Sequence, residues 1–92
     1  MAHPVNKKLL KDFGARIREL RTVRGLSQEQ LAELTGFHRT YIGMVERGER
    51  NLSLSNIGVF ANTFKMTESE LFDLNRVNAQ HDFKRSEFKN EK

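Results

Sequence analysis

The sequence predicts an all-α fold, a compact domain of five short helices. Apolar residues recur at helical spacing through residues 10–74. Capping residues and glycines divide this stretch into short segments, joined by loops of about two to six residues that suit a compact domain. The chain has 92 residues, which is enough for one domain with a small core.

The composition excludes several classes of protein. Sixteen Lys and Arg residues stand against twelve Asp and Glu residues, and the net charge of +4 suits a polyanionic partner, although many proteins carry as much. There is no cysteine, and therefore no disulfide, thiolate zinc site or cysteine nucleophile. No apolar run approaches the roughly 20 residues of a membrane span, and the N-terminus lacks the apolar region of a signal peptide. We expect a cytoplasmic protein.

The folded domain is expected to span residues 7–74, after a flexible lead-in over residues 1–6. The first helix runs to about Arg24, with Gly25 as its stop signal. Gly14, inside this helix, costs about 1 kcal/mol relative to alanine, and a close contact with another helix would explain it. The apolar face of this helix consists of Leu10, Phe13, Ile17 and Leu20.

The same helix is strongly basic, and two interpretations stay open. Its cations are either a solvated helix face or a set of phosphate contacts. Against two acidic residues, Asp12 and Glu19, the helix carries Lys7, Lys8, Lys11, Arg16, Arg18, Arg21 and Arg24.

A second helix is marked at both ends. Ser27 is expected to be its N-cap, and Gln30 completes a capping box. Gly36 marks its end, because glycine adopts positive φ without steric cost. Its buried side is expected to consist of Leu31, Ala32 and Leu34.

A third helix follows after a tight turn. Phe37 is expected to enter the core, and Ile42 and Val45 continue the apolar stripe. Two helices that cross steeply through a short turn bring their backbones close together, which requires a small residue such as Ala32. The pattern indicates a helix-turn-helix; the alternative is an ordinary helical hairpin inside a small bundle.

The outward face of the third helix is rich in hydrogen-bond donors. Arg39 can donate two parallel hydrogen bonds to guanine O6 and N7, and Thr40 can meet a phosphate or a thymine methyl group. Gly43 keeps its position slim for a close approach, and His38 either starts the helix in solvent or contacts DNA. The positions expected to face outward are His38, Arg39, Thr40, Gly43 and Arg47.

Phosphate contacts are expected around this face. The second helix presents free N–H groups at its N-terminus, where Gln28 adds a donor. Tyr41 either contacts the sugar-phosphate backbone or packs at the core edge. Glu46 would repel phosphate, so it is better explained as a structural partner of Arg21. The remaining candidates for phosphate contact are Arg47, Arg50, Asn51 and Ser53.

Two further helices complete the domain. Ser53 or Ser55 caps the fourth, whose apolar positions are Ile57, Phe60, Ala61 and Phe64. Thr67 and Glu70 form a second capping box before the inward residues Leu71 and Leu74. Residues 75–92 are a polar tail that extends the fifth helix, holds a partner or is loose.

Residues 10–74 resemble the phage-repressor (Cro/cI, XRE) family, whose fold is a lambda-repressor-like DNA-binding domain. The segments that match are LSQEQLAELTG and YIGMVERG, at Leu26, Ser27, Gln28, Leu31, Ala32, Gly36, Ile42, Glu46 and Gly48. Within the family, residues 39–54 are similar to the controller proteins of restriction–modification systems. The resemblance implies five helices and a homodimer on a near-palindromic operator. It also implies the Arg21–Glu46 pair, an Arg39-Thr40-Tyr41 turn in the major groove and backbone contacts from Arg50 and Asn51.

A homodimer needs an apolar patch that the core leaves over. Two-fold dimers place two recognition helices about 34 Å apart, one turn of DNA. Val59 and Phe72 fall off the inward stripes of their helices, and with Leu74 they are the candidate dimer interface. Alternatively, Phe72 covers the core of its own monomer.

The sequence raises three kinds of function. The first is a sequence-specific DNA-binding transcriptional regulator that activates or represses its own operon. The second is an antitoxin- or antirepressor-like module with a protein partner, docked through Phe83 and Phe88 of the tail. The third, an enzyme, lacks a nucleophile–base arrangement, a Gly-rich phosphate loop and a paired carboxylate site. No cofactor is expected, and no metal either, because the three histidines His3, His38 and His81 lie far apart in the sequence.

Overall fold

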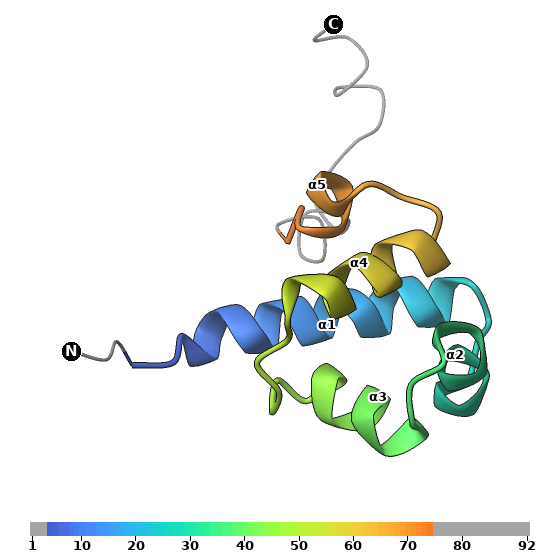
Figure 1. Cartoon of the computed structure of the whole chain (residues 1–92), viewed down its shortest axis with the longest axis horizontal. Coiled ribbons are helices and arrows are strands. Elements are labelled where there is room, and N and C mark those ends of the chain that lie inside the picture. The colour runs from blue at the N-terminus through green and yellow to red at the C-terminus, as the bar shows by residue number, and fades with distance from the viewer. Residues whose placement is uncertain (1–3, 75–92) are drawn as a thin grey trace, which may run out of the picture.

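The structure is a computed structural model that describes residues 4–74 (Figure 1). Its elements are α1 (Lys7–Val23), α2 (Gln28–Thr35), α3 (Arg39–Glu46), α4 (Leu54–Thr63) and α5 (Glu68–Leu71). The predicted all-α fold of five helices is confirmed in this part of the chain. No helix there is long and apolar enough to cross a membrane. The predictions for the tail, Phe83 and Phe88 included, lie outside the described residues, as do His3 and His81.

Local capping explains where the helices begin. Ser27 and Gln30 form the predicted capping box at α2, and Thr67 and Glu70 form the one at α5. Of the two candidates at α4, Ser53 is the cap, since its side chain accepts from the backbone N–H of Asn56. At the end of α2, Gly36 has a φ of 84°, so its lack of a side chain permits the turn into α3.

The helices pack around α1, which runs through the length of the domain in Figure 1. There α3 lies along one side of α1, α4 crosses it, and α5 lies beyond α4. The core that they enclose consists of Phe13, Ile17, Leu20, Leu31, Ala32, Ile42, Val45, Phe60, Ala61, Phe64 and Leu71. Of the residues expected to be inward, Phe37, Ile57 and Leu74 are partly buried against this core.

One predicted core residue is exposed. Leu34 was expected on the buried side of α2, but 61% of its surface is accessible. The buried arc of this short helix is centred between Leu31 and Ala32. Because each residue turns the helix by about 100°, Leu34 falls on the far side of Leu31 from Ala32, outside that arc.

A buried arginine joins α5 to α1. Arg16 was counted among the cations of α1, but it is only 3% exposed. Its Nε donates to the carbonyl of Leu71 at 3.1 Å, and its Nη2 donates to that of Glu70 at 2.7 Å. Arg24 likewise donates to the Phe64 carbonyl at 3.1 Å. The basic character of α1 and its C-cap is therefore partly structural, and the buried Arg16 does not face a ligand.

Gly14 marks the closest approach of two helices. A methyl group at this position would overlap the backbone carbonyl oxygens of Val45 and Glu46, at the end of α3. The close helix contact that would explain this glycine is thus present. Since the obstacle is backbone, it cannot be relieved by moving one flexible side chain.

We expect Gly14→Ala to lower the free energy of unfolding by about 1–3 kcal/mol, because the added methyl group forces α1 and α3 apart. Urea denaturation followed by circular dichroism measures the change. Gly58→Ala is the matched control: its new Cβ would lie 3.6 Å from Glu68 Oε2, an ordinary contact. That variant should gain about 0.5–1 kcal/mol from helix propensity. Equal effects of the two changes would contradict this account.

Candidate nucleic-acid interface

One face of α3 is open to solvent and the other is buried. Ile42 and Val45 are 0% and 1% exposed, so they fix which side of the helix faces the core. The opposite side begins with His38, Arg39 and Thr40, all of them exposed. His38 occupies the N-cap position without a side-chain capping bond. This end of α3 therefore presents polar side chains to any molecule that approaches it.

Gly43 does not lie open as predicted. It is buried, and a Cβ placed there would lie 3.2 Å from Arg47 Nη1 and 3.7 Å from Gln28 Oε1. The two long side chains fill the hollow that the glycine leaves. The surface at this position is thus formed by Gln28 and Arg47, so direct backbone approach to Gly43 was the wrong expectation.

A partly buried ion pair joins the C-terminal end of α3 to α1. Arg21 donates to Glu46 through Nε at 2.6 Å and through Nη2 at 3.0 Å, and these side chains are 12% and 4% exposed. Gln28 adds a hydrogen bond from Nε2 to Glu46 Oε1 at 3.0 Å. The hydrogen bond with Glu46 raises the pKa of Arg21. This network joins α1, α2 and α3, and it uses one of the two amide hydrogens of Gln28.

Tyr41 packs at the edge of the core. Its ring centroid lies 4.9 Å from that of Phe37, and its hydroxyl accepts a hydrogen bond from Asn56 Nδ2 at 3.0 Å. The guanidinium carbon of Arg50 lies 5.4 Å from the ring centroid, so the tyrosine also carries a cation–π contact. Of the two roles left open for Tyr41, the structure shows the packing role, with Arg50 placed on top of it.

Two arginines at this surface have exposed acidic partners that the sequence reasoning missed. Arg39 contacts Glu29 at 2.9 Å, and Arg47 contacts Glu49 at 3.0 Å. The hydrogen bond from Arg47 lowers the pKa of Glu49. Exposed pairs of this kind contribute little to stability, so Arg47 can exchange Glu49 for a polyanion. Glu29 binds only Nε of Arg39 and leaves the two terminal nitrogens of that side chain to a ligand. Neither pair has the i,i+4 spacing that would have signalled it.

The loop after α3 supplies further polar groups. Arg50 and Asn51 are exposed between α3 and α4. The Ser53 hydroxyl oxygen is occupied as the cap of α4, where it accepts from Asn56 at 3.1 Å. This loop lies at the opposite end of α3 from His38, so polar groups flank the helix at both ends.

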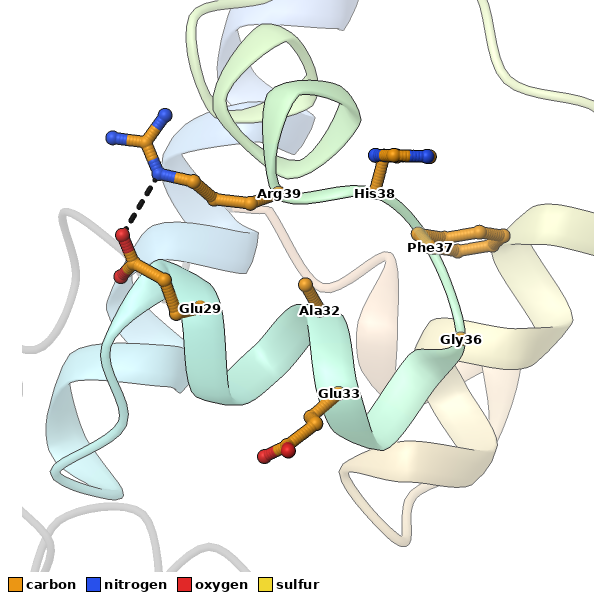
Figure 2. A pocket seen from close by; sticks show the side chains of 7 residues that line it. All are labelled: Glu29, Ala32, Glu33, Gly36, Phe37, His38 and Arg39. Atoms are coloured by element: carbon orange, nitrogen blue, oxygen red, sulfur yellow. Dashed lines mark hydrogen bonds and ion pairs between the residues drawn. The ribbon is translucent and has the colours of Figure 1, made fainter.

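A shallow open cleft of about 410 Å³ lies beside the α2–α3 turn (Figure 2). Ala32 and Phe37 give it an apolar side, and charged side chains border it. Its lining consists of Glu29, Ala32, Glu33, Gly36, Phe37, His38 and Arg39.

Comparison with known proteins agrees with this geometry. The model of the helix-turn-helix family HTH_3 matches residues 17–71. The chain belongs to this family. Its relatives include control protein C.SmaI of Serratia marcescens, 49% identical over 55 residues that cover 60% of this chain. The chain spans 66% of that relative, just under two thirds.

Two solved structures extend the comparison. The restriction-modification controller protein C.AhdI from Aeromonas hydrophila is 55% identical, with a TM-score of 0.65 over 67% of this chain and 94% of that one. The controller protein C.Esp1396I was solved as a tetramer with its natural 35 base-pair operator. It is 28% identical, with a TM-score of 0.68 over 75% of this chain and 92% of that one. The family and the fold around α3 are thereby established.

Arg21→Met should lower the free energy of unfolding by about 3 kcal/mol, because it leaves the Glu46 carboxylate partly buried without its cation. Thermal or urea unfolding provides the measurement. Arg47→Met removes an exposed pair and should change stability little. Equal free energies of unfolding for the two variants would contradict the conclusion that the buried Arg21–Glu46 pair stabilises the position of α3.

Proposed function

We propose that this chain is a sequence-specific DNA-binding transcriptional regulator of the restriction–modification controller type. It acts as a homodimer on a near-palindromic operator. The observation that carries the proposal is the exposed start of α3, where His38, Arg39 and Thr40 face solvent while Ile42 and Val45 are buried. The similarity to C.AhdI, and to a controller solved on its operator, supports it.

In this proposal α3 is the recognition helix. Arg39 donates to guanine in the major groove, and Thr40 and His38 contact neighbouring bases. Gly43 contributes only through the two side chains that cover it. Phosphate contacts come from the N-terminus of α2 and from the polar side chains around the recognition helix. These are Gln28, Arg47, Arg50, Asn51 and Ser53, with Tyr41 supporting Arg50.

The proposed dimer interface consists of Val59 on α4 and of Phe72 and Leu74, which directly follow α5. Phe72 is 39% exposed although its ring centroid lies 5.3 Å from that of Phe13. One side of this ring thus packs on the core, while the remainder stays available to a second copy. Val59 and Leu74 are half-buried, so each keeps part of its apolar surface for the same interface.

Arg39→Ala should cost about 1–3 kcal/mol of binding free energy on the operator and relax the preference at one base position. The operator is first obtained by selecting sites from random DNA with the full chain, and the variants are then titrated against single-base changes. Arg50→Ala is the comparison, because a phosphate contact should weaken binding to all sequences alike. It should also make the salt slope of log K shallower by about one unit.

The two arginines must differ for these roles to hold. Uniform weakening by Arg39→Ala on every sequence would mean that Arg39 only contacts phosphate. A change in base preference caused by Arg50→Ala would overturn its assignment to the backbone.

Phe72→Asp should convert the dimer to a monomer, since it places a charge in the apolar interface. Analytical ultracentrifugation measures the mass, and circular dichroism checks that the helices remain. Leu34→Asp, at an apolar residue that is 61% exposed on α2, is the matched control and should stay dimeric. A folded Phe72→Asp variant that still sediments as a dimer would rule out this patch.

A further inference from the structure

The cleft beside the α2–α3 turn contains an ion pair that the proposed function leaves unused. Glu29, in the first turn of α2, accepts a hydrogen bond from Arg39 Nε at 2.9 Å (Figure 2). The side chains of Arg39 and Glu29 are 59% and 66% exposed. The pair thus lies at the surface where Arg39 would meet a duplex, and not in the supporting network behind it.

The geometry of this contact keeps the recognising edge of Arg39 free. A bidentate contact with guanine needs two N–H groups side by side. Glu29 engages Nε alone, and among residues 4–74 neither terminal nitrogen of Arg39 has a hydrogen-bond acceptor. In Figure 2 both terminal nitrogens point away from the carboxylate. The pair therefore holds the stem of the side chain while its outer two nitrogens face outward.

Glu29 offers Arg39 a negatively charged acceptor. A hydrogen bond from its own backbone N–H and the one from Arg39 lower the pKa of Glu29, so the carboxyl group is ionised at neutral pH. An anion on the first turn of α2 that binds Nε restricts a long side chain that would otherwise sample many rotamers. Restricting the side chain before binding reduces the entropy lost when the complex forms.

We infer that Glu29 is a positioning residue that sets the specificity of Arg39. It orders the guanidinium for guanine in the free protein and remains bound to Nε in the complex. This inference rests on the proposed function, because it assigns a role toward the base that Arg39 recognises. Glu29 makes no contact with the base itself.

The test is Glu29→Gln in the full chain. Affinity is measured for the duplex selected from random DNA and for an unselected duplex of the same length, at one salt concentration. The ratio of the two affinities should fall about three- to tenfold, because Arg39 must now be ordered on binding. In the Arg39→Ala background, Glu29→Gln should leave that ratio unchanged.

Glu33→Gln is the matched control. Glu33 is exposed one turn further along α2, has no ion-pair partner within residues 4–74, and points away from Arg39 in Figure 2. Its loss of one negative charge should raise the affinity for both duplexes alike and keep the ratio within about twofold.

Two results would overturn the inference while the proposed function stands. The first is an equal ratio for Glu29→Gln and Glu33→Gln. The second is a higher ratio for Glu29→Gln than for the unmodified chain, which would make Glu29 a restraint on Arg39. A failure of the unmodified chain to prefer any selected duplex would instead overturn the proposed function itself.

Discussion

The close contact between α1 and α3 at Gly14 determines which side of α3 the domain exposes to solvent. The carbonyl oxygens of Val45 and Glu46 lie where any side chain at Gly14 would be, so the end of α3 is seated directly on α1. Two turns further along α1, Arg21 binds Glu46 in the same region. The C-terminal end of α3 is thus fixed by both shape and charge. Its N-terminal end, which begins at His38, projects from the domain with its polar side outward.

The arginines divide into two groups by what holds them. Arg16 and Arg21 on α1 and Arg24 at its C-cap donate to protein carbonyls or to Glu46, and they stabilise the fold. Among residues 4–74, the acidic partners of Arg39 and Arg47 are exposed. Arg47 can release Glu49, and Arg39 keeps its two terminal nitrogens open while Glu29 binds its Nε. Net charge alone does not distinguish these groups, because every arginine adds the same single positive charge to the total of +4. The binding surface is therefore defined by which cations keep N–H groups available to a ligand, rather than by how many cations there are.

Much of the fold followed from local rules. The capping boxes at Ser27 and Thr67 and the turn at Gly36 depend on residues only a few positions apart, so the sequence was sufficient to predict them. The division of α3 into buried and exposed sides followed from Ile42 and Val45 in the same way.

The errors came from contacts between segments distant in sequence. Leu34 is apolar and on a helix, but the buried arc is set by where α2 meets its neighbours. Nothing near Arg16 in the sequence separates it from the exposed cations of α1, because the carbonyls that it binds belong to α5. Gly43 was expected to be open, but it is covered by Gln28 of α2 and by Arg47, whose side chain lies along its own helix. Helical periodicity does not predict which long side chains cover a glycine such as Gly43.

Arg16 also links two properties that are usually considered separately. A helix of four residues such as α5 is too short to persist alone, so its position depends on the two carbonyls that Arg16 holds. The same helix α1 also packs directly against the end of α3 at Gly14. In a symmetric dimer joined next to α5, these two contacts of α1 would therefore set the distance between the two recognition helices. That distance in turn sets the spacing of the half-sites. Inserting a single base pair between those half-sites would turn one of them by about a tenth of a helical turn.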